Sequence, residues 1–394
     1  MKKVLLVTRS LTGGGAERVA ASLATFLQDR YEVLLVVIDG SRQTYETEAE
    51  KIILNLSVSN KGTFYKRIKW FTTLYREFAS IRRKFNPDCV ISFLTEPELV
   101  NALTSKQSRS VTSIRNVRSS VVHGRLKMFR DKWVFSRMNE IVSLSVNAKE
   151  DLIVNYDVPD KKIKVIYNIC EKKRIAQKIR ENGVLESEVC WFGEHTLITL
   201  GRLTEQKAQW HMIRAFTKVL QDFPDAKLVI LGEGPQEEYL RRLISEYKIE
   251  NSVGLLGYKS NPYPYLANST GFVFSSIFEG LGNSIIEALA CGLPVISTDC
   301  NAGPREILAP DSDFSKGTER IEYAEYGILT PVCDGEKYQS DDPLTYEEEQ
   351  LAIAMKKILS GQSLRCKYAQ KAEERGHQFD KEQILQQWYE VIEG

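Results

Sequence analysis

The feature that most constrains this chain is a repeated pattern: a short apolar run, then a polar turn, then a helical segment. Residues 2–8 (KKVLLVT) form the first apolar run, and residues 31–39, 88–94, 140–145 and 160–170 repeat it. A run that is apolar at successive positions is typical of a strand buried on both faces of a sheet. Because such strands alternate with helical segments, the sequence predicts an α/β fold built on parallel, doubly wound sheets.

The same pattern starts again after a polar stretch near residues 170–190. Further apolar runs lie at residues 196–203, 226–235, 271–277 and 294–298. A chain of 394 residues is also too long for one ordinary core. We therefore expect two Rossmann-like domains, residues 1–175 and 176–376, facing each other across a cleft, and a C-terminal helix at residues 377–394 that returns to the first domain.

The composition is that of a globular, cytoplasmic protein. Hydrophobic residues make up 43% and charged residues 27%, and no apolar run is long enough to span a bilayer. Only one strand-length apolar run follows Met1, so we expect no signal peptide. The seven cysteines lack CxxC spacing and are expected to be reduced thiols rather than disulfides or zinc ligands.

The net charge of +1 hides two basic segments. Residues 61–84 contain eight Lys and Arg against one acid, and residues 105–137 contain nine against one. Residues 61–85 also predict an amphipathic helix, which either packs on its own sheet or lies in a membrane interface. No nucleic-acid motif accompanies the charge, so we expect docking to an anionic membrane surface. The side expected to be apolar carries Ile68, Phe71, Leu74, Tyr75 and Phe78, and the expected docking cations are Lys66, Arg67, Lys69, Arg82, Arg83 and Lys84.

Three turns that follow predicted strands carry candidate ligand-binding residues. The first is RSLTGGGAER, where Gly14 and Gly15 let the backbone approach a ligand and the following helix presents free N–H groups to an anion. The glycine spacing does not match the dinucleotide pattern. A tight turn without a ligand is the simpler alternative.

The second turn is GRLTEQK. Arg202 and Lys207 lie five positions apart at the entry to a helix and are able to converge on one diphosphate. Taken alone, two solvated surface cations explain this motif equally well.

The third turn is FEGLGNSIIEALACG, residues 278–292. Glu279 lies in the turn, and Glu287 lies one helical turn after Asn283 on the helix that follows. Carboxylates accept hydrogen bonds from vicinal hydroxyls, such as those of a sugar or a ribose, and the helix start between them suits a diphosphate. For each residue taken alone there is a simpler alternative: Glu279 is an acid at a helix start, and Glu287 is an exposed helical residue, neither with a ligand.

In this order along the chain, the three turns resemble the motifs of glycosyltransferase family 4, a family of retaining enzymes with the GT-B architecture. The resemblance is strongest from Thr196 to Leu308, and GPREIL matches a variant found in the branch that builds bacterial surface glycans. It implies that Arg202 and Lys207 neutralise the donor diphosphate, Glu279 binds the donor sugar and Glu287 binds the ribose. The catalytic set so implied is Arg202, Lys207 and Glu279, and the donor-binding set is Gly14, Gly15, Tyr258, Lys259, Gly280, Leu281, Gly282, Asn283 and Glu287.

The sequence departs from the family pattern at one place. Many members carry a cleft-facing His in the first domain, whereas this chain has Arg115 and Asn116 there, which we assign to the acceptor side. Because Arg115 has no exchangeable proton at neutral pH, we assign no general base. We expect no metal and no other cofactor, since no Asp-x-Asp follows a strand and the DSD at residues 311–313 suits a plain turn.

The resemblance implies sugar transfer from a nucleotide diphosphate donor, a UDP-hexose or UDP-N-acetylhexosamine, with retention at the anomeric carbon. The expected acceptor is a glycan on a polyprenyl diphosphate lipid at the inner face of the cell membrane. A nucleotide-sugar 2-epimerase and a non-catalytic binding scaffold remain alternatives. A phosphorylase would need a pyridoxal-binding lysine, and the sequence singles none out.

Overall fold

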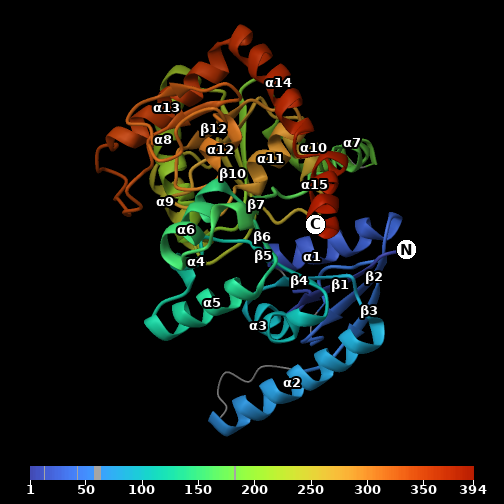
Figure 1. The fold of residues 1–394 in the computed structure, drawn as a ribbon. Helices are drawn as coiled ribbons and strands as arrows, with labels where there is room; N and C mark the ends of the chain where they lie inside the picture. The colour runs from blue at the N-terminus through green and yellow to red at the C-terminus, as the bar shows by residue number, and fades with distance from the viewer. Residues whose placement is uncertain (13, 42, 57–63, 182) are drawn as a thin grey trace. The chain divides into compact units, whose positions relative to one another are not determined.

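The chain folds into two compact units (Figure 1). One unit contains Met1–Ile169 together with Ile384–Gly394, and the other contains Cys170–Gln383. The chain therefore leaves the first unit at Ile169 rather than at residue 175, and it returns within the last helix, α15 (Lys381–Glu393). The computed structural model describes residues 1–12, 14–41, 43–56, 64–181 and 183–394.

The first unit is built on a seven-stranded sheet in which every pair of neighbouring strands is parallel, in the order β3-β2-β1-β4-β5-β6-β7. The sequence pattern missed two of these strands. β3 lies at an edge of the sheet, and β5 carries buried Ser and Thr side chains, of which Thr112 donates to the Ser92 carbonyl of the neighbouring strand. The bounds are β1 (Lys3–Thr8), β2 (Glu32–Val37), β3 (Glu50–Ile53), β4 (Cys89–Phe93), β5 (Arg109–Ile114), β6 (Glu140–Ser143) and β7 (Ile163–Val165).

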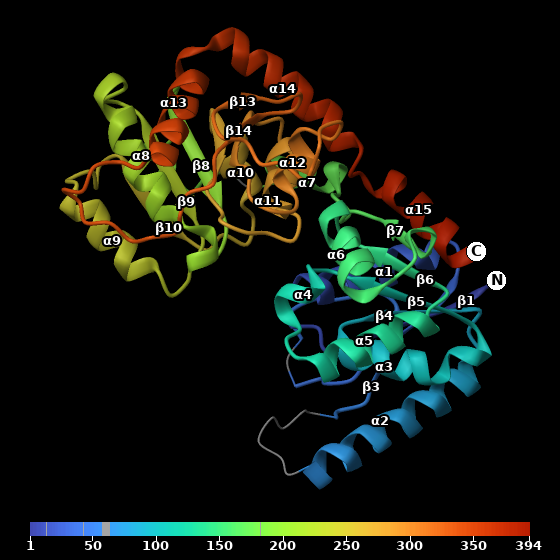
Figure 2. The same ribbon diagram turned by 60° about the vertical axis from the view of Figure 1, so that its left-hand side comes forward.

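Helices cover both faces of this sheet, which explains the continuous apolar strands. Along β1, Val4 and Leu6 pack against one set of helices, while Leu5 and Val7 pack against the other. Figures 1 and 2 show α1 on one face and α2, α3 and α5 on the opposite face. The helices are α1 (Gly15–Phe26), α2 (Phe64–Phe85), α3 (Thr95–Thr104), α4 (Arg118–Val121), α5 (Arg125–Arg137) and α6 (Val146–Tyr156).

The second unit repeats the architecture. Its sheet has the order β10-β9-β8-β11-β12-β14-β13, parallel throughout except for the antiparallel pair of β13 and β14. Two parallel-sheet α/β units of this kind confirm the predicted fold class. The strands are β8 (Thr196–Leu200), β9 (Lys227–Leu231), β10 (Val253–Gly257), β11 (Gly271–Phe274), β12 (Val295–Thr298), β13 (Glu322–Tyr323) and β14 (Ile328–Thr330).

The charged stretch that was expected to mark the domain boundary is a helix of the second unit, α7, which packs against α10. The segment is polar because α7 is exposed on most of its surface and buries only Ile175. A polar composition of this kind is therefore no sign of a domain boundary here. No helix in the described part of the chain is long and apolar enough to cross a membrane. The helices of this unit are α7 (Lys172–Glu181), α8 (Gln209–Asp222), α9 (Glu237–Glu246), α10 (Tyr263–Ala267), α11 (Asn283–Ala290), α12 (Pro304–Leu308), α13 (Tyr346–Ser360) and α14 (Gln362–His377).

Candidate functional site

The turns after β8 and β11 lie side by side, because these two strands are neighbours in the second sheet and run parallel. The backbone N–H of Ile277 donates to the carbonyl of Gln206 at 2.9 Å. The hydroxyl of Ser275 donates to the carbonyl of Lys207 at 2.8 Å. These bonds tie GRLTEQK to FEGLGN, so the fold brings together two motifs that are about 70 residues apart in the sequence.

Lys207 and Glu279 meet at the centre of this site. The Lys207 Nζ lies 2.5 Å from the Glu279 Oε1, and their side chains are 18% and 9% exposed. Nζ also lies 4.6 Å from the centroid of the Phe274 ring, within cation–π range. A partly buried ion pair of this kind holds both side chains in fixed positions while the lysine keeps N–H donors for a further ligand.

Arg202 is placed differently from Lys207, although both lie in the same turn. Its side chain is exposed, and no acceptor for the guanidinium occurs among the residues that the structure describes. The main chain around it is fixed, because Gln209 donates to the Arg202 carbonyl at 3.1 Å. The exposed guanidinium thus stands on a rigid support and is available to an anion.

Helix α11 begins beside this pair, and its N-cap is a glycine, which has no side chain to cap the first N–H groups. Its N-cap, Gly282, has φ of 89°, a left-handed conformation that favours glycine. Leu281 is only 2% exposed, so its contribution to a ligand site is limited to its backbone. The helix start therefore presents oriented N–H groups near the Lys207–Glu279 pair, as an anion site requires.

Glu287 lies on the same helix, half-buried, one turn after the exposed Asn283. Burial, with a smaller contribution from the Glu287 charge, raises the pKa of the Cys291 thiol to about 12. Glu287 thus lies close to a neutral thiol.

Tyr258 and Lys259, which follow β10, were both predicted to lie near the donor. Tyr258 is 69% exposed and open to a ligand. Lys259 is engaged elsewhere: its Nζ lies 2.7 Å from Glu188 and 5.4 Å from the centroid of the Tyr265 ring. The structure therefore brings Tyr258, but not the Lys259 amine, to an open position.

In the first unit, the glycine-rich turn leads into α1 as expected, with Gly14 as the N-cap and Gly15 as the first helical residue. A Cβ on Gly15 would meet no atom within 4 Å, so this backbone is open. The Glu17 side chain, however, lies against Gly14, within 2.1 Å of where a Cβ would stand. An anion at this helix start would have to displace that carboxylate. Gly13 lies outside the described residues.

Arg115 follows β5 at the carboxyl edge of the first sheet. Its Nη1 donates to the Ile166 carbonyl and to the Asn168 Oδ1, both at 3.2 Å, and its guanidinium lies 5.6 Å from the centroid of the Trp388 ring. Burial lowers the pKa of Arg115 to about 9. These contacts tie β5, β7 and α15 together, which is a structural role. Asn116 is half-buried beside it.

The basic surfaces of the first unit are smaller than the sequence suggests. Arg82 is 1% exposed and hydrogen-bonds inside the unit, so it was wrongly placed among the docking cations. In residues 105–137, Arg118 is buried between Glu98 and Asp131, both 2.8 Å away. Lys132 pairs with Asp157. The local charge count included Asp131 but missed Glu98 and Asp157, because these two lie on other elements.

The apolar side of α2 also differs from the expected one. Leu74 and Phe78 are fully buried and Phe71 partly, as predicted. Ile68 and Tyr75 are instead 47% and 39% exposed, because they lie outside the narrow stripe that faces the sheet.

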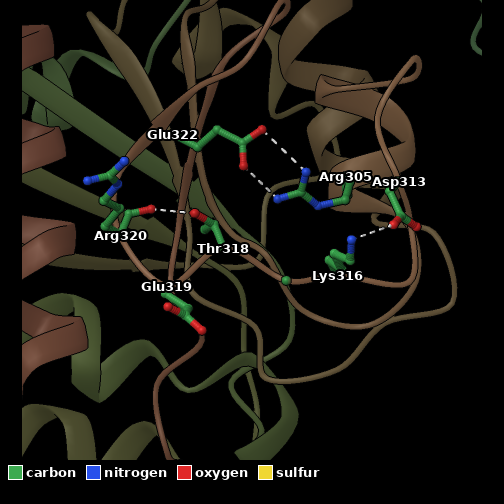
Figure 3. Close-up of a pocket in the computed structure, with 8 residues that line it drawn as sticks. Arg305, Asp313, Lys316, Thr318, Glu319, Arg320 and Glu322 are labelled. Carbon is green, nitrogen blue, oxygen red and sulfur yellow. Dashed lines mark hydrogen bonds and ion pairs between the residues drawn. The ribbon is translucent and has the colours of Figure 1, made fainter.

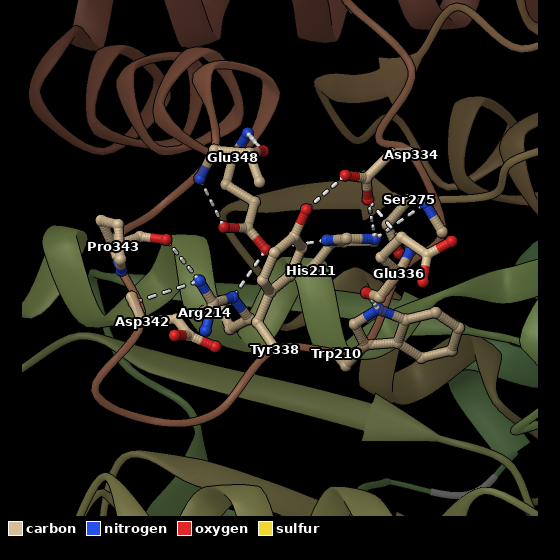
Figure 4. Close-up of polar contacts among 12 residues, drawn as sticks. Trp210, His211, Arg214, Ser275, Asp334, Glu336, Tyr338, Asp342, Pro343 and Glu348 are labelled. Carbon is tan, nitrogen blue, oxygen red and sulfur yellow. Dashed lines mark hydrogen bonds and ion pairs between the residues drawn. The ribbon is translucent and has the colours of Figure 1, made fainter.

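A buried polar network supports α8, the helix that the Arg202–Lys207 turn enters (Figure 4). His211 and Arg214 both bond to Glu348 of α13, at 2.7 Å and 2.8 Å, and all three side chains are fully buried. His211 therefore has a structural role.

A separate hollow of about 520 Å³ lies near β13 (Figure 3). Arg305 lines it and is already paired with Asp299 and Glu322, at 2.5 Å and 2.7 Å. The described residues contain no cluster of three or more His, Cys, Asp or Glu that could hold a metal ion. Unlike Arg202, the Arg305 guanidinium at this hollow already has carboxylate partners.

Comparison with known proteins agrees with this arrangement. The family described as Glycosyl transferases group 1 matches residues 192–328, and Glycosyltransferase Family 4 matches residues 13–174. An uncharacterised glycosyltransferase of Methanocaldococcus jannaschii is 34% identical over 89% of each chain. A Campylobacter jejuni N-acetylgalactosamine-N,N'-diacetylbacillosaminyl-diphospho-undecaprenol 4-alpha-N-acetylgalactosaminyltransferase is 29% identical over 98% of this chain and 97% of its own.

Among solved structures, Anabaena Alr3699/HepE in complex with UDP and glucose superposes with a TM-score of 0.75 over the whole of both chains, at 18% identity. That likeness establishes the fold. Together with the family matches and the M. jannaschii relative, it shows that the chain belongs to the family 4 glycosyltransferases of GT-B architecture.

Proposed function

We propose that this glycosyltransferase moves a sugar from a UDP-sugar to a glycan carried on a polyprenyl diphosphate lipid, with retention at the anomeric carbon, in bacterial glycan synthesis. The observation that supports the transfer chemistry is the Lys207–Glu279 pair, with Arg202 exposed in the same turn and the glycine-capped start of α11 beside it.

The charges at this site suit a departing diphosphate. Arg202 offers a planar fork to phosphate oxygens, Lys207 offers a point charge, and the α11 N–H groups add oriented donors. Preorganised donors of this kind stabilise negative charge that develops in a transition state, so the proposed reaction requires no metal ion.

Glu279 and Glu287 are proposed to hold the two ends of the donor. Glu279 is positioned by Lys207 and accepts hydrogen bonds from the transferred sugar, while Glu287 accepts from the ribose. The proposed proton acceptor is the departing phosphate on the same face of the sugar, because no side chain is assigned as a general base. The choice of UDP is supported by the UDP complex of the structurally similar Alr3699/HepE protein.

The lipid-linked acceptor is supported by the C. jejuni relative, whose name contains such an acceptor, and by the surface of the first unit. On α2, Tyr65, Ile68 and Tyr75 are exposed among the cations Lys66 and Lys69. Exposed aromatic and aliphatic side chains beside cations are typical of helices that lie in a membrane interface.

A second exposed apolar group lies on α4 and α5, on the sheet face that also carries α2 (Figure 2). Leu126 is 89% exposed, Phe129 is 74% exposed, and Val121 is 54% exposed. Arg125 and Lys127 flank them, exposed and without an ion-pair partner in the described chain. We therefore propose peripheral docking to an anionic membrane through α2 and the start of α5, where each cation contributes on the order of 1 kcal/mol.

The test is to incubate the protein with UDP-glucose, UDP-galactose or their N-acetyl forms, with and without an undecaprenyl diphosphate-linked glycan, in buffer containing EDTA. We expect acceptor-dependent release of UDP, and NMR of the product should show the anomeric configuration of the donor. Release of free sugar and UDP without acceptor would support the epimerase instead. UDP-sugar binding without turnover would support a scaffold, and complete loss of activity in EDTA would contradict the metal-free reaction.

A further inference from the structure

A small hollow at the C-terminal end of α2 stands apart from the transfer site. It has a volume of about 290 Å³ and is lined by Arg82, Arg83, Asn86, Pro87 and Ser108, which we call the α2-end pocket. Pro87 precedes β4 and Ser108 precedes β5, so the pocket lies where these strands begin. The strands are five and six residues long and advance about 3.3 Å per residue, which places the pocket roughly 15–20 Å from their carboxyl ends.

Arg82 brings an unusual buried charge to this pocket. Its side chain is 1% exposed and donates only to neutral oxygens, including the Thr104 and Ser108 hydroxyls at 2.7 Å each. No carboxylate in the described chain pairs with it, and its Nε has no acceptor there. Burial lowers the pKa of Arg82 to about 10, as expected for a cation without a counter-charge.

The other lining groups add donors and no acid. Arg83 is exposed, with no ion-pair partner among the described residues. The Ser108 hydroxyl accepts from Arg82, so its own proton remains available to a ligand. The nearby Asp88 carboxylate already accepts from the Lys3 backbone N–H at 2.8 Å.

The charge balance favours an anion. The C-terminal ends of α2 and α3 each contribute about half a negative charge, which together offset one of the two arginines. Among the lining groups and these helix ends, about one positive charge remains; the Asp88 carboxylate is exposed and lies outside the lining. Because a water takes up about 30 Å³, the hollow has room for an oxyanion with a substituent rather than for a few waters alone.

From this geometry we propose that the α2-end pocket binds a phosphate-type oxyanion, gripped by the Arg83 guanidinium and the Ser108 hydroxyl in the field of Arg82. The ligand is a phosphomonoester headgroup of a membrane lipid or a free phosphate. Arg83 and Tyr65 are 18 positions apart, five whole turns of a helix, so Arg83 shares the outward line of α2 with Tyr65. That alignment places the pocket on the side of α2 that is proposed to meet the membrane.

The experiment titrates inorganic phosphate into the full-length protein and measures the heat of binding. We expect saturable binding that weakens at least tenfold in Arg83→Gln and in Ser108→Ala, and less in Arg83→Lys. Lys84→Gln, the neighbouring exposed cation outside the lining, is the matched control and should bind as the unmodified protein does. Thermal unfolding of each variant checks that the unit stays folded.

A second arm compares vesicles containing phosphatidic acid with vesicles of equal charge containing phosphatidylserine. A preference for phosphatidic acid that is lost in Arg83→Gln identifies the lipid headgroup as the source. Phosphate binding without that preference identifies a free phosphate. Absence of both, or binding that neither Arg83→Gln nor Ser108→Ala weakens, overturns the proposal. Sugar transfer to a detergent-dispersed acceptor should be unchanged in Arg83→Gln, so this outcome is separate from the proposed function.

Discussion

Arg202 and Lys207 occupy one turn, yet their side chains lie in different environments. Lys207 is partly buried against Glu279, whereas Arg202 is exposed and has no acceptor in the described chain. The difference arises because β11 and its turn lie on the Lys207 side of GRLTEQK. A substitution of Arg202 should therefore remove a ligand contact without disturbing the packing.

We expect Arg202→Ala to lower kcat by roughly 10²-fold or more, as removal of one charge-stabilising donor typically does. Its unfolding free energy should change by less than about 0.5 kcal/mol, as for other surface substitutions. Steady-state kinetics and urea unfolding measure the two effects. Arg242→Ala, an exposed arginine on α9 of the same unit, is the control; activity near normal in folded Arg202→Ala would refute the assigned role.

Substitutions of Glu279 and Glu287 should have different effects, one on turnover of the sugar and the other on binding of the nucleotide. Glu279→Gln keeps the side-chain shape but removes the charge that pairs with Lys207, so turnover should fall while UDP alone still binds. Glu287→Gln should weaken the binding of UDP itself. Calorimetry with UDP on both variants distinguishes these outcomes, and the reverse order would mean that the two ends of the donor have been assigned the wrong way round.

At the scale of single elements, α2 shows how one helix serves two environments. Leu74 and Phe78 bury one side against the sheet, while Tyr65 and Ile68 leave apolar surface in solvent. The same helix contributes Arg82 to the interior and Lys66 and Lys69 to the surface. Its exposed face is therefore available for membrane docking without any change in the core.

Replacing Lys66, Lys69 and Arg76 of α2 by Gln should abolish co-sedimentation with anionic vesicles at low salt. Three cations at about 1 kcal/mol each correspond to roughly a hundredfold loss in binding. UDP binding should stay intact, because these residues belong to the first unit whereas the α11 site belongs to the second. A variant that neutralises Arg241, Arg242 and Lys248 on the second unit is the charge-matched control. Sedimentation of the unmodified protein with neutral vesicles to the same extent would argue against electrostatic docking.

For the whole molecule, the notable feature is that the first unit is not continuous in sequence. Residues 384–394 complete its core, where Trp388 is 1% exposed among residues of β1, β2 and α1. The end of the chain is therefore part of the folding unit that begins at the N-terminus.

We expect Trp388→Ala to lower the unfolding free energy of the first unit by about 3–5 kcal/mol, as for large core aromatics. Trp388→Phe should retain most of the stability. Chemical unfolding measures the loss of unfolding free energy, and hydrogen exchange shows which of the two units has lost it. A loss confined to residues 170–383 would contradict this assignment.

Much of the fold could be read from the sequence because it depends on local patterns. Continuous apolar strands require two covered faces, so the alternation of strands and helices was sufficient to predict two parallel α/β sheets. The approximate positions of Arg202, Glu279 and the start of α11 followed from the same pattern, since each comes directly after a strand. Strands β3 and β5 escaped prediction, because one is a short edge strand and the other is rich in Ser and Thr.

Only the tertiary structure decided which charges remain available. The Lys207–Glu279 pair, the engagement of Lys259 by Glu188 and the burial of Arg82 each join residues from separate elements. Ion pairing and burial depend on distances across space, and sequence spacing reports such distances only within a single helix or turn. The chain's sequence therefore determined its architecture and the turns that carry its chemistry, whereas the fold determined which of their side chains a ligand can reach.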